Sequence, residues 1–280
     1  MSLTLMYITN KPDVAKIAQK SGVDRIFGDM EYIGKDDRQK GMDTVKSHHT
    51  YIDIENISQA IRGGDSKLQV RINPIHDATT SYCSSEEEID TVIECGADII
   101  MLPMFKTPHE VEKFLNAVNG RAKTVLLLET KEADQAINEI LSVGGYDEFH
   151  VGINDLHLAY KKKFMFELYI DGTLDRLSRI FNENNIRFGI GGIARVGYGM
   201  LPAEYIIAEH YRLGSKMAIL SRSFCDANKS TNMQELEEVF MNGVHNIRKF
   251  EKKAQLFSPA DFENNHKVVE GLIAEIIKNK

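Results

Sequence analysis

Short apolar runs alternate with amphipathic segments along nearly the whole chain. Eight of these runs have the length and composition of β-strands: Leu3–Ile8, Arg25–Met30, Leu68–Asn73, Asp98–Pro103, Lys123–Thr130, Glu148–Ile153, Arg187–Gly192 and Met217–Phe224. A short, nearly continuous apolar run is typical of a strand that is buried on both faces, as in a parallel sheet. The pattern therefore predicts a sheet of eight buried strands.

The segments between these runs have the features of helices. Thr107 is the predicted N-cap of one helix, and Pro108 occupies its first position, where a missing N–H costs nothing. The predicted helices cover Pro12–Lys20, Ser85–Cys95, Thr107–Asn116, Lys131–Leu141, Thr173–Asn184, Ala203–Leu213, Met233–Phe250 and Ala260–Lys278. The stretch Gly34–Thr50 is charged and contains histidines, so we expect a long loop there, before Ile52–Ile61.

Eight strand–helix units in roughly 250 residues predict an α/β fold of the (β/α)8 TIM-barrel type. A doubly wound open sheet is the alternative. We expect one catalytic domain over residues 1–257, because no linker-like or low-complexity segment divides the chain. Residues 258–280 form an additional C-terminal helix with an apolar face, which we expect to pack on the barrel or on a neighbouring subunit of a homo-oligomer.

The composition restricts the classes of function. With 42% hydrophobic and 27% charged residues and a formal charge of -7, the chain has an ordinary globular composition and no nucleic-acid-binding surface is expected. No apolar run approaches the roughly 20 residues of a membrane span, and the N-terminus lacks the basic region of a signal peptide. Three scattered cysteines fit a reducing compartment, so we predict a cytoplasmic protein.

Charged residues gather at the ends of the predicted strands. Asp29 and Glu31 end the second strand region, Arg71 the third, Glu129 the fifth and Asp155 the sixth. Strand ends of a barrel converge on one face, where active sites lie. Carboxylate oxygens are ligands for a hard divalent cation, and an arginine fork binds carboxylates. The pattern predicts a metal site that holds a small carboxylate substrate.

Five motifs in chain order strengthen this prediction: Gly28-Asp-Met-Glu31, Val70-Arg-Ile72, Gly96-Ala-Asp-Ile-Ile-Met-Leu-Pro103, Glu129-Thr-Lys131 and Gly152-Ile-Asn-Asp-Leu156. Together they resemble the HpcH/HpaI aldolase and citrate lyase beta-subunit family of pyruvate-binding barrels. The resemblance implies that Glu129 and Asp155 bind Mg²⁺ or Mn²⁺ and that Arg71 binds the substrate carboxylate. We expect Arg71, Gly152, Asn154 and Pro103 to contact the substrate.

Three of these residues also have a simpler interpretation. The alternative for Glu129 is a salt bridge to a cation on a neighbouring strand, and the alternative for Asp155 is the N-cap of a following turn. Arg71 is also suited to neutralising Glu31, with or without a substrate.

This chain departs from the family pattern at one of the expected proton-transfer residues. The aldolase branch has a histidine after its Asp-x-Glu motif, and this chain has Tyr32 there. Tyrosine, with a pKa near 10, is a poor base at neutral pH. We therefore expect Glu31, with Asp29 beside it, to supply the acid/base group, and His48 or His49 of the following loop is an alternative.

The predicted function is a metal-dependent carbon–carbon lyase or aldolase that acts on a small 2-oxoacid or 3-hydroxyacid. Two alternatives remain: an acyl-CoA lyase of the citrate lyase type, and a binding barrel that keeps the metal without catalysis. A phosphate-handling barrel is a further alternative, because Gly189-Ile-Gly-Gly192 lies where barrels often bind phosphate.

Overall fold

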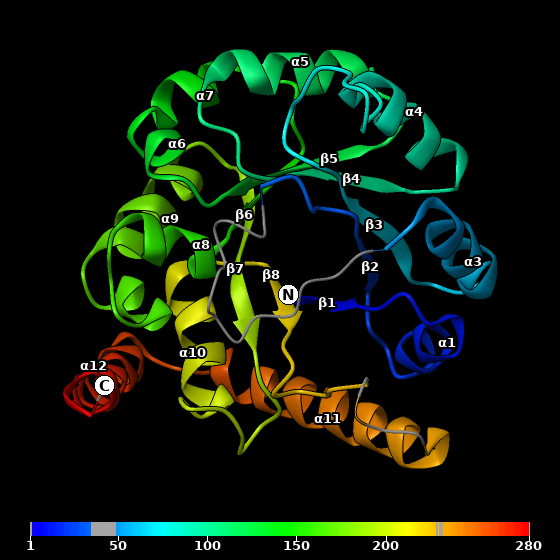
Figure 1. Ribbon diagram of the computed structural model, residues 1–280. Helices are drawn as coiled ribbons and strands as arrows, with labels where there is room; N and C mark the ends of the chain where they lie inside the picture. Colours follow the sequence, from blue (N-terminus) through cyan, green and yellow to red (C-terminus); the bar gives the residue numbers. More distant parts are fainter. Residues whose placement is uncertain (1, 35–48, 228, 230–231, 280) are drawn as a thin grey trace. The chain divides into compact units, whose positions relative to one another are not determined.

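The computed structural model describes residues 2–34, 49–227, 229 and 232–279. Its eight strands form a closed parallel barrel in chain order, from β1 to β8 (Figure 1). The prediction of a (β/α)8 barrel is therefore confirmed, and the open sheet is excluded. The strands are β1 (Thr4–Ile8), β2 (Arg25–Asp29), β3 (Lys67–Arg71), β4 (Ile99–Leu102), β5 (Lys123–Leu128), β6 (Glu148–Val151), β7 (Arg187–Ile193) and β8 (Met217–Leu220).

Helices follow the strands as predicted, with some corrected boundaries. They are α1 (Pro12–Lys20), α3 (Tyr51–Ile61), α4 (Ser85–Glu94), α5 (Pro108–Val118), α6 (Lys131–Gln135), α7 (Ile137–Val143), α8 (Ile153–Ala159), α9 (Thr173–Glu183), α10 (Ala203–Leu213), α11 (Met233–Ala254) and α12 (Pro259–Lys278), with a 3-10 helix η1 over Met165–Tyr169. The predicted helix Lys131–Leu141 is in fact two helices, because Ala136 leaves the helical conformation. Most of the predicted loop Gly34–Thr50 lies outside the described residues.

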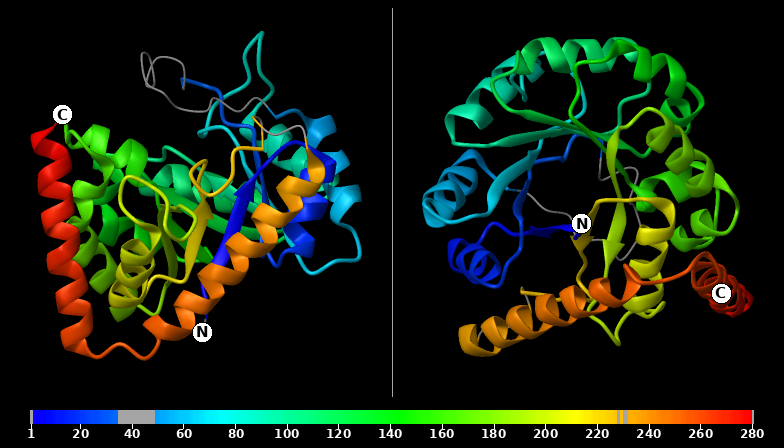
Figure 2. Two further views of the ribbon diagram at one scale, coloured as in Figure 1. Left: turned by 90° about the horizontal axis from the view of Figure 1, so that it is seen from below. Right: turned by 180° about the vertical axis from the view of Figure 1, so that it is seen from behind.

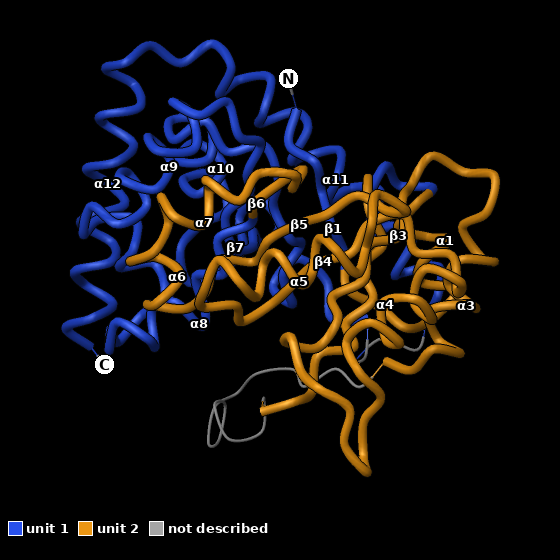
Figure 3. Tube along the Cα trace, turned by 90° about the horizontal axis from the view of Figure 1, so that it is seen from above, with its two compact units in different colours: residues 1–7, 20–23, 150–280 blue, residues 8–19, 24–149 orange. Residues whose placement is uncertain are grey.

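The chain forms two compact units, which Figure 3 shows in different colours. Unit 1 contains residues 1–7, 20–23 and 150–280, and unit 2 contains residues 8–19 and 24–149. In unit 2, the helices α3, α4, α5 and α7 lie outside β2–β5 (Figure 1). The strand residues of this unit are almost completely buried, as at Val70, Ile100 and Leu126.

Helix α12 packs on α10 within unit 1 (Figure 2). Its capping box at Ser258 starts the helix, and its apolar residues Val269 and Ile273 are buried. The contact also contains a buried carboxylate, since Glu209 of α10 accepts hydrogen bonds from Asn265 and from His266. The C-terminal helix thus has a specific polar attachment within its own chain.

The glycines of β7 have a packing role. A Cβ at Gly189 would lie 2.4 Å from Nδ1 of His150, and a Cβ at Gly191 would lie 2.6 Å from the Ile153 side chain. A Cβ at Gly189 would also lie 2.8 Å from the carbonyl oxygen of Met217, and Gly191 has a φ of 40°, so both positions favour glycine. This geometry accounts for the Gly189–Gly192 motif without a phosphate ligand.

No helix in the described part of the chain is long and apolar enough to cross a membrane.

Candidate functional site

Asp29 and Arg71 are the last residues of β2 and β3, and they are partners in the strand register. Partners in register point their side chains to the same face of a sheet. The guanidinium of Arg71 donates from Nε to Oδ1 of Asp29 at 2.8 Å and from Nη2 to Oδ2 at 2.9 Å. The pair is bidentate, so Asp29 fixes the plane of the arginine fork.

Glu31 contacts the same arginine, since its Oε2 lies 3.4 Å from Nη1 of Arg71. Both Asp29 and Glu31 are only 2% exposed. Burial by itself would lower the pKa of Arg71, but Asp29, Glu31 and then Glu129 outweigh it and raise that pKa well above its usual value. Arg71 is therefore a permanent positive charge that exchanges no proton.

The arginine fork has two edges that can each make a bidentate contact. A guanidinium carries five N–H groups, and Asp29 takes one on Nε and one on Nη2. The edge formed by Nη1 and Nη2 is the second bidentate face of the fork, with Glu31 beside it. A carboxylate that docks on this edge would lie next to the carboxyl group of Glu31.

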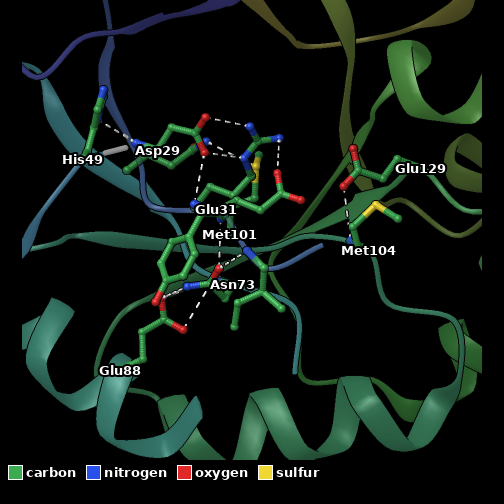
Figure 4. Close-up of polar contacts among 12 residues, drawn as sticks. Asp29, Glu31, His49, Asn73, Glu88, Met101, Met104 and Glu129 are labelled. Carbon is green, nitrogen blue, oxygen red and sulfur yellow. Dashed lines mark hydrogen bonds and ion pairs between the residues drawn. The ribbon is translucent and has the colours of Figure 1, made fainter. Parts of the chain in front are cut away.

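Glu129 follows β5 directly and is 3% exposed. Its Oε1 accepts a hydrogen bond from the backbone N–H of Met104 at 3.1 Å (Figure 4). Met104 has a φ of 55°, a left-handed conformation that costs energy for a residue with a side chain. The buried Pro103 precedes it at the end of β4. The loop after β4 thus orients the Glu129 carboxylate.

The donor set of unit 2 suits a cation. Three buried carboxylates, Asp29, Glu31 and Glu129, act on the single guanidinium of Arg71. The carboxylate oxygens of Glu129 are the kind of ligand that a hard divalent ion such as Mg²⁺ prefers. Among the described residues, no group of three or more His, Cys, Asp or Glu side chains is arranged around a metal position. A metal site here would have fewer protein ligands and more water or substrate oxygens.

Asp155 belongs to unit 1, and its predicted position at a strand end is wrong. Strand β6 ends at Val151, Gly152 is the N-cap, and Asp155 lies half-buried in the first turn of α8 together with Asn154. The apolar run Phe149–Ile153 made the strand look longer, but the backbone turns into the helix at Gly152. The pairing of Asp155 with Glu129 stays a prediction, as do the substrate contacts of Gly152, Asn154 and Pro103.

Tyr32 and His49 both lie near the arginine–carboxylate cluster. Burial, followed by the charge of Glu88, raises the pKa of Tyr32 above its ordinary value, so this phenol keeps its proton at neutral pH. Nδ1 of His49 accepts a hydrogen bond from the backbone N–H of Asp29 at 2.9 Å, so this nitrogen is not available as a base. His48, the other predicted alternative, lies outside the described residues.

Two buried residues of this region, Asn73 and Glu88, were not identified from the sequence. Nδ2 of Asn73 donates to Oε1 of Glu88 at 2.8 Å (Figure 4). Glu88 belongs to the acidic first turn of α4, where carboxylates are expected for the helix dipole. Its helical spacing from the apolar Val92 was the signal that this carboxylate faces inward.

Comparisons with known proteins give a family match and two solved structures with a similar fold. The sequence profile of a family described as HpcH/HpaI aldolase/citrate lyase matches residues 3–165. No curated protein sequence matches the chain.

Two solved structures share the fold. The HpcH/HpaI aldolase from Desulfitobacterium hafniense DCB-2 is 13% identical with a TM-score of 0.60, covering 79% of this chain and 86% of its own. A HpcH/HpaI aldolase/citrate lyase family protein from Burkholderia cenocepacia J2315 is also 13% identical, with a TM-score of 0.64, covering 85% of this chain and 95% of its own.

Proposed function

Because the chain belongs to the HpcH/HpaI aldolase/citrate lyase family, we propose that it is a divalent-metal-dependent carbon–carbon lyase of the aldolase type. Its substrate would be a small 2-oxoacid or 3-hydroxyacid. The observation that carries the proposal is the Arg71 fork, which Asp29 holds on one edge while its other edge lies beside Glu31.

Arg71 would bind the carboxylate of the substrate through Nη1 and Nη2. The bidentate contact with Asp29 keeps the fork in one orientation before the substrate arrives, which lowers the entropy cost of binding. Because Arg71 stays charged, it would also stabilise negative charge that develops on the bound 2-oxoacid.

Glu129 and Asp155 would hold the metal, as the family resemblance implies. When bound, a divalent cation supplies Lewis-acid polarisation of the substrate carbonyl. The hydrogen bond from Met104 would orient the Glu129 carboxylate for that role.

Glu31 would move the proton in the cleavage step. Its carboxylate accepts the proton of the substrate hydroxyl, the adjacent carbon–carbon bond breaks to release an aldehyde, and the electron pair of that bond forms an enolate in the 2-oxoacid half. Glu31 then returns the proton to the enolate carbon, so protons and electrons balance. Tyr32, which keeps its proton, would not serve as the base.

The test is a coupled assay of pyruvate release from a 4-hydroxy-2-oxoacid, with Mg²⁺ and with a chelator. We expect turnover that requires the metal, is lost in Glu129→Gln and is retained in Glu132→Gln, which changes an exposed carboxylate three residues away. Full metal-dependent turnover by Glu129→Gln would overturn the proposal. Calorimetric binding of Mg²⁺ and pyruvate without any product would instead identify a binding barrel.

A further inference from the structure

Asn73 holds the segment that carries Glu31. It lies two residues after Arg71, is 2% exposed, and its Oδ1 accepts hydrogen bonds from the backbone N–H groups of Tyr32 and Ile33, both at 3.0 Å. Both donors directly follow Glu31. One side-chain amide thus satisfies two consecutive peptide groups of this segment.

Glu88 determines the orientation of the Asn73 amide. Its Oε1 accepts from Nδ2 of Asn73 at 2.8 Å and from the backbone N–H of Asn73 at 3.2 Å (Figure 4). The amide oxygen faces two donors and the amide nitrogen faces a carboxylate, so the opposite rotamer would place donors against donors. Burial raises the pKa of Glu88, while its hydrogen bonds from Asn73 act in the opposite direction.

The segment is fixed on both sides of Glu31. Before it, the backbone N–H of Met30 donates to the carbonyl of Arg71 at 2.9 Å. After it, Tyr32 and Ile33 are held by Asn73. Glu31 lies between these two attachments, with its carboxyl group 3.4 Å from Arg71. Loss of the second attachment would let the Glu31 backbone move while the arginine stays in place.

We propose that Asn73 is a positioning residue for the reaction, oriented by Glu88, that holds Glu31 at the arginine edge where the substrate binds. The role rests on the proposed function, because it assigns Asn73 to the proton-transfer step. It adds a hydrogen-bonded chain from Glu88 of α4 through Asn73 to the backbone N–H groups of Tyr32 and Ile33, which directly follow Glu31.

Reversal of the hydrogen-bond polarity tests this role. Asn73→Ala removes the acceptor of both N–H groups, and Asn73→Asp places a second carboxylate against Glu88. The double variant Asn73→Asp with Glu88→Gln restores the pattern, because the glutamine amide donates to the new aspartate and the net charge of the pair stays the same. Glu86→Ala, on the exposed side of the same helix turn, is the matched control.

We expect Asn73→Ala and Asn73→Asp to lose roughly 10²-fold in kcat, as a small misplacement of a reacting group does. KM should change by less than about threefold, because Arg71 and Asp29 keep their contact. The double variant should recover most of kcat, and Glu86→Ala should equal the wild type. A purely structural role would lower the amount of folded enzyme and would not separate kcat from KM in the folded fraction.

Amide hydrogen exchange at Tyr32 and Ile33 measures their hydrogen bonds to Asn73 and does not depend on turnover. We expect protection of both amides in the wild type, loss in folded Asn73→Ala and recovery in the double variant. Equal protection in Asn73→Ala and wild type, or equal kcat, would overturn the positioning role. A wild type without lyase activity would overturn the proposed function alone, since the exchange result still decides whether Asn73 holds the segment.

Discussion

The substitution Asp29→Asn tests whether the buried pair of Asp29 and Arg71 holds the site together. Asparagine has the shape of aspartate but only one acceptor oxygen, and its NH₂ group would face the N–H groups of the guanidinium. One of the two hydrogen bonds, at 2.8 and 2.9 Å, is therefore lost and a donor is placed against a donor. Arg71 keeps its contact with Glu31.

The size of the effect follows from burial. A hydrogen bond to a charged group contributes about 1.5–3 kcal/mol, and removal of one partner of a buried ion pair costs about 3–5 kcal/mol. Because Glu31 and Glu129 still offset the charge of Arg71, we expect a loss of about 2–3 kcal/mol in the free energy of unfolding. At about 2–4 °C per kcal/mol for a chain of this size, Tm should fall by about 4–12 °C.

Urea unfolding at neutral pH measures this loss, with Glu263→Gln as the control. That variant removes a carboxylate from an exposed pair, in which Glu263 and Lys267 are 68% and 63% exposed and 2.7 Å apart. An exposed pair contributes only about 0.2–1 kcal/mol, so its loss should be small. If Asp29→Asn were no less stable than Glu263→Gln, the buried pair would not be what fixes Arg71, and the reasoning would be refuted.

Three further variants test separate parts of the structure. Burial raises the pKa of Glu88, so the folded state binds that proton more tightly than the unfolded state, and the stability this provides is lost as pH rises through the raised pKa. Glu88→Gln should therefore raise Tm near pH 7.5 and leave it unchanged below pH ~4. An equal shift of Tm at both pH values would contradict this. Met104→Val should be about 1–2 kcal/mol less stable than Met104→Gly in urea unfolding, because φ at this residue is 55° and a β-branched residue disfavours this left-handed conformation. Equal stability of the two variants would show that the loop changes its conformation. Glu209→Ala should lower the free energy of unfolding by about 3 kcal/mol, because the buried carboxylate connects α12 to α10. It should also speed proteolysis within residues 258–279. An unchanged rate of cleavage would show that apolar packing alone holds α12.

The sequence predicted the architecture because buried strands and capped helices have strong local patterns. All eight strands were located, and the ends of α1 and α10 were predicted correctly. The errors occurred where local signals are weak. Helix α8 is only seven residues long and starts inside an apolar run, and η1 is a 3-10 helix that does not show the 3.6-residue period.

The site was predicted only in its charged part. Charges at strand ends identified Asp29, Glu31 and Arg71, which the structure brings into contact. Asn73 was missed, since its role depends on backbone N–H groups about forty residues earlier in the chain, a contact that no local pattern encodes. Glu88 was missed because it is the last of three consecutive glutamates, Glu86–Glu88. Only its position on the helix places it on the buried face of α4.

Two of the contacts that hold the segment Asp29–Ile33 should have different kinetic effects. The contact of Asp29 with Arg71 follows from the register of β2 and β3, which does not involve Asn73. Asp29→Asn loosens Arg71, the proposed anchor of the substrate carboxylate, so it should raise KM more than it lowers kcat. Asn73→Ala should instead lower kcat with little change in KM. Steady-state kinetics of both variants with one substrate makes this comparison. The same ratio of kcat and KM effects in both would mean that the segment moves as one body, so that substrate binding and proton transfer are not held by separate contacts.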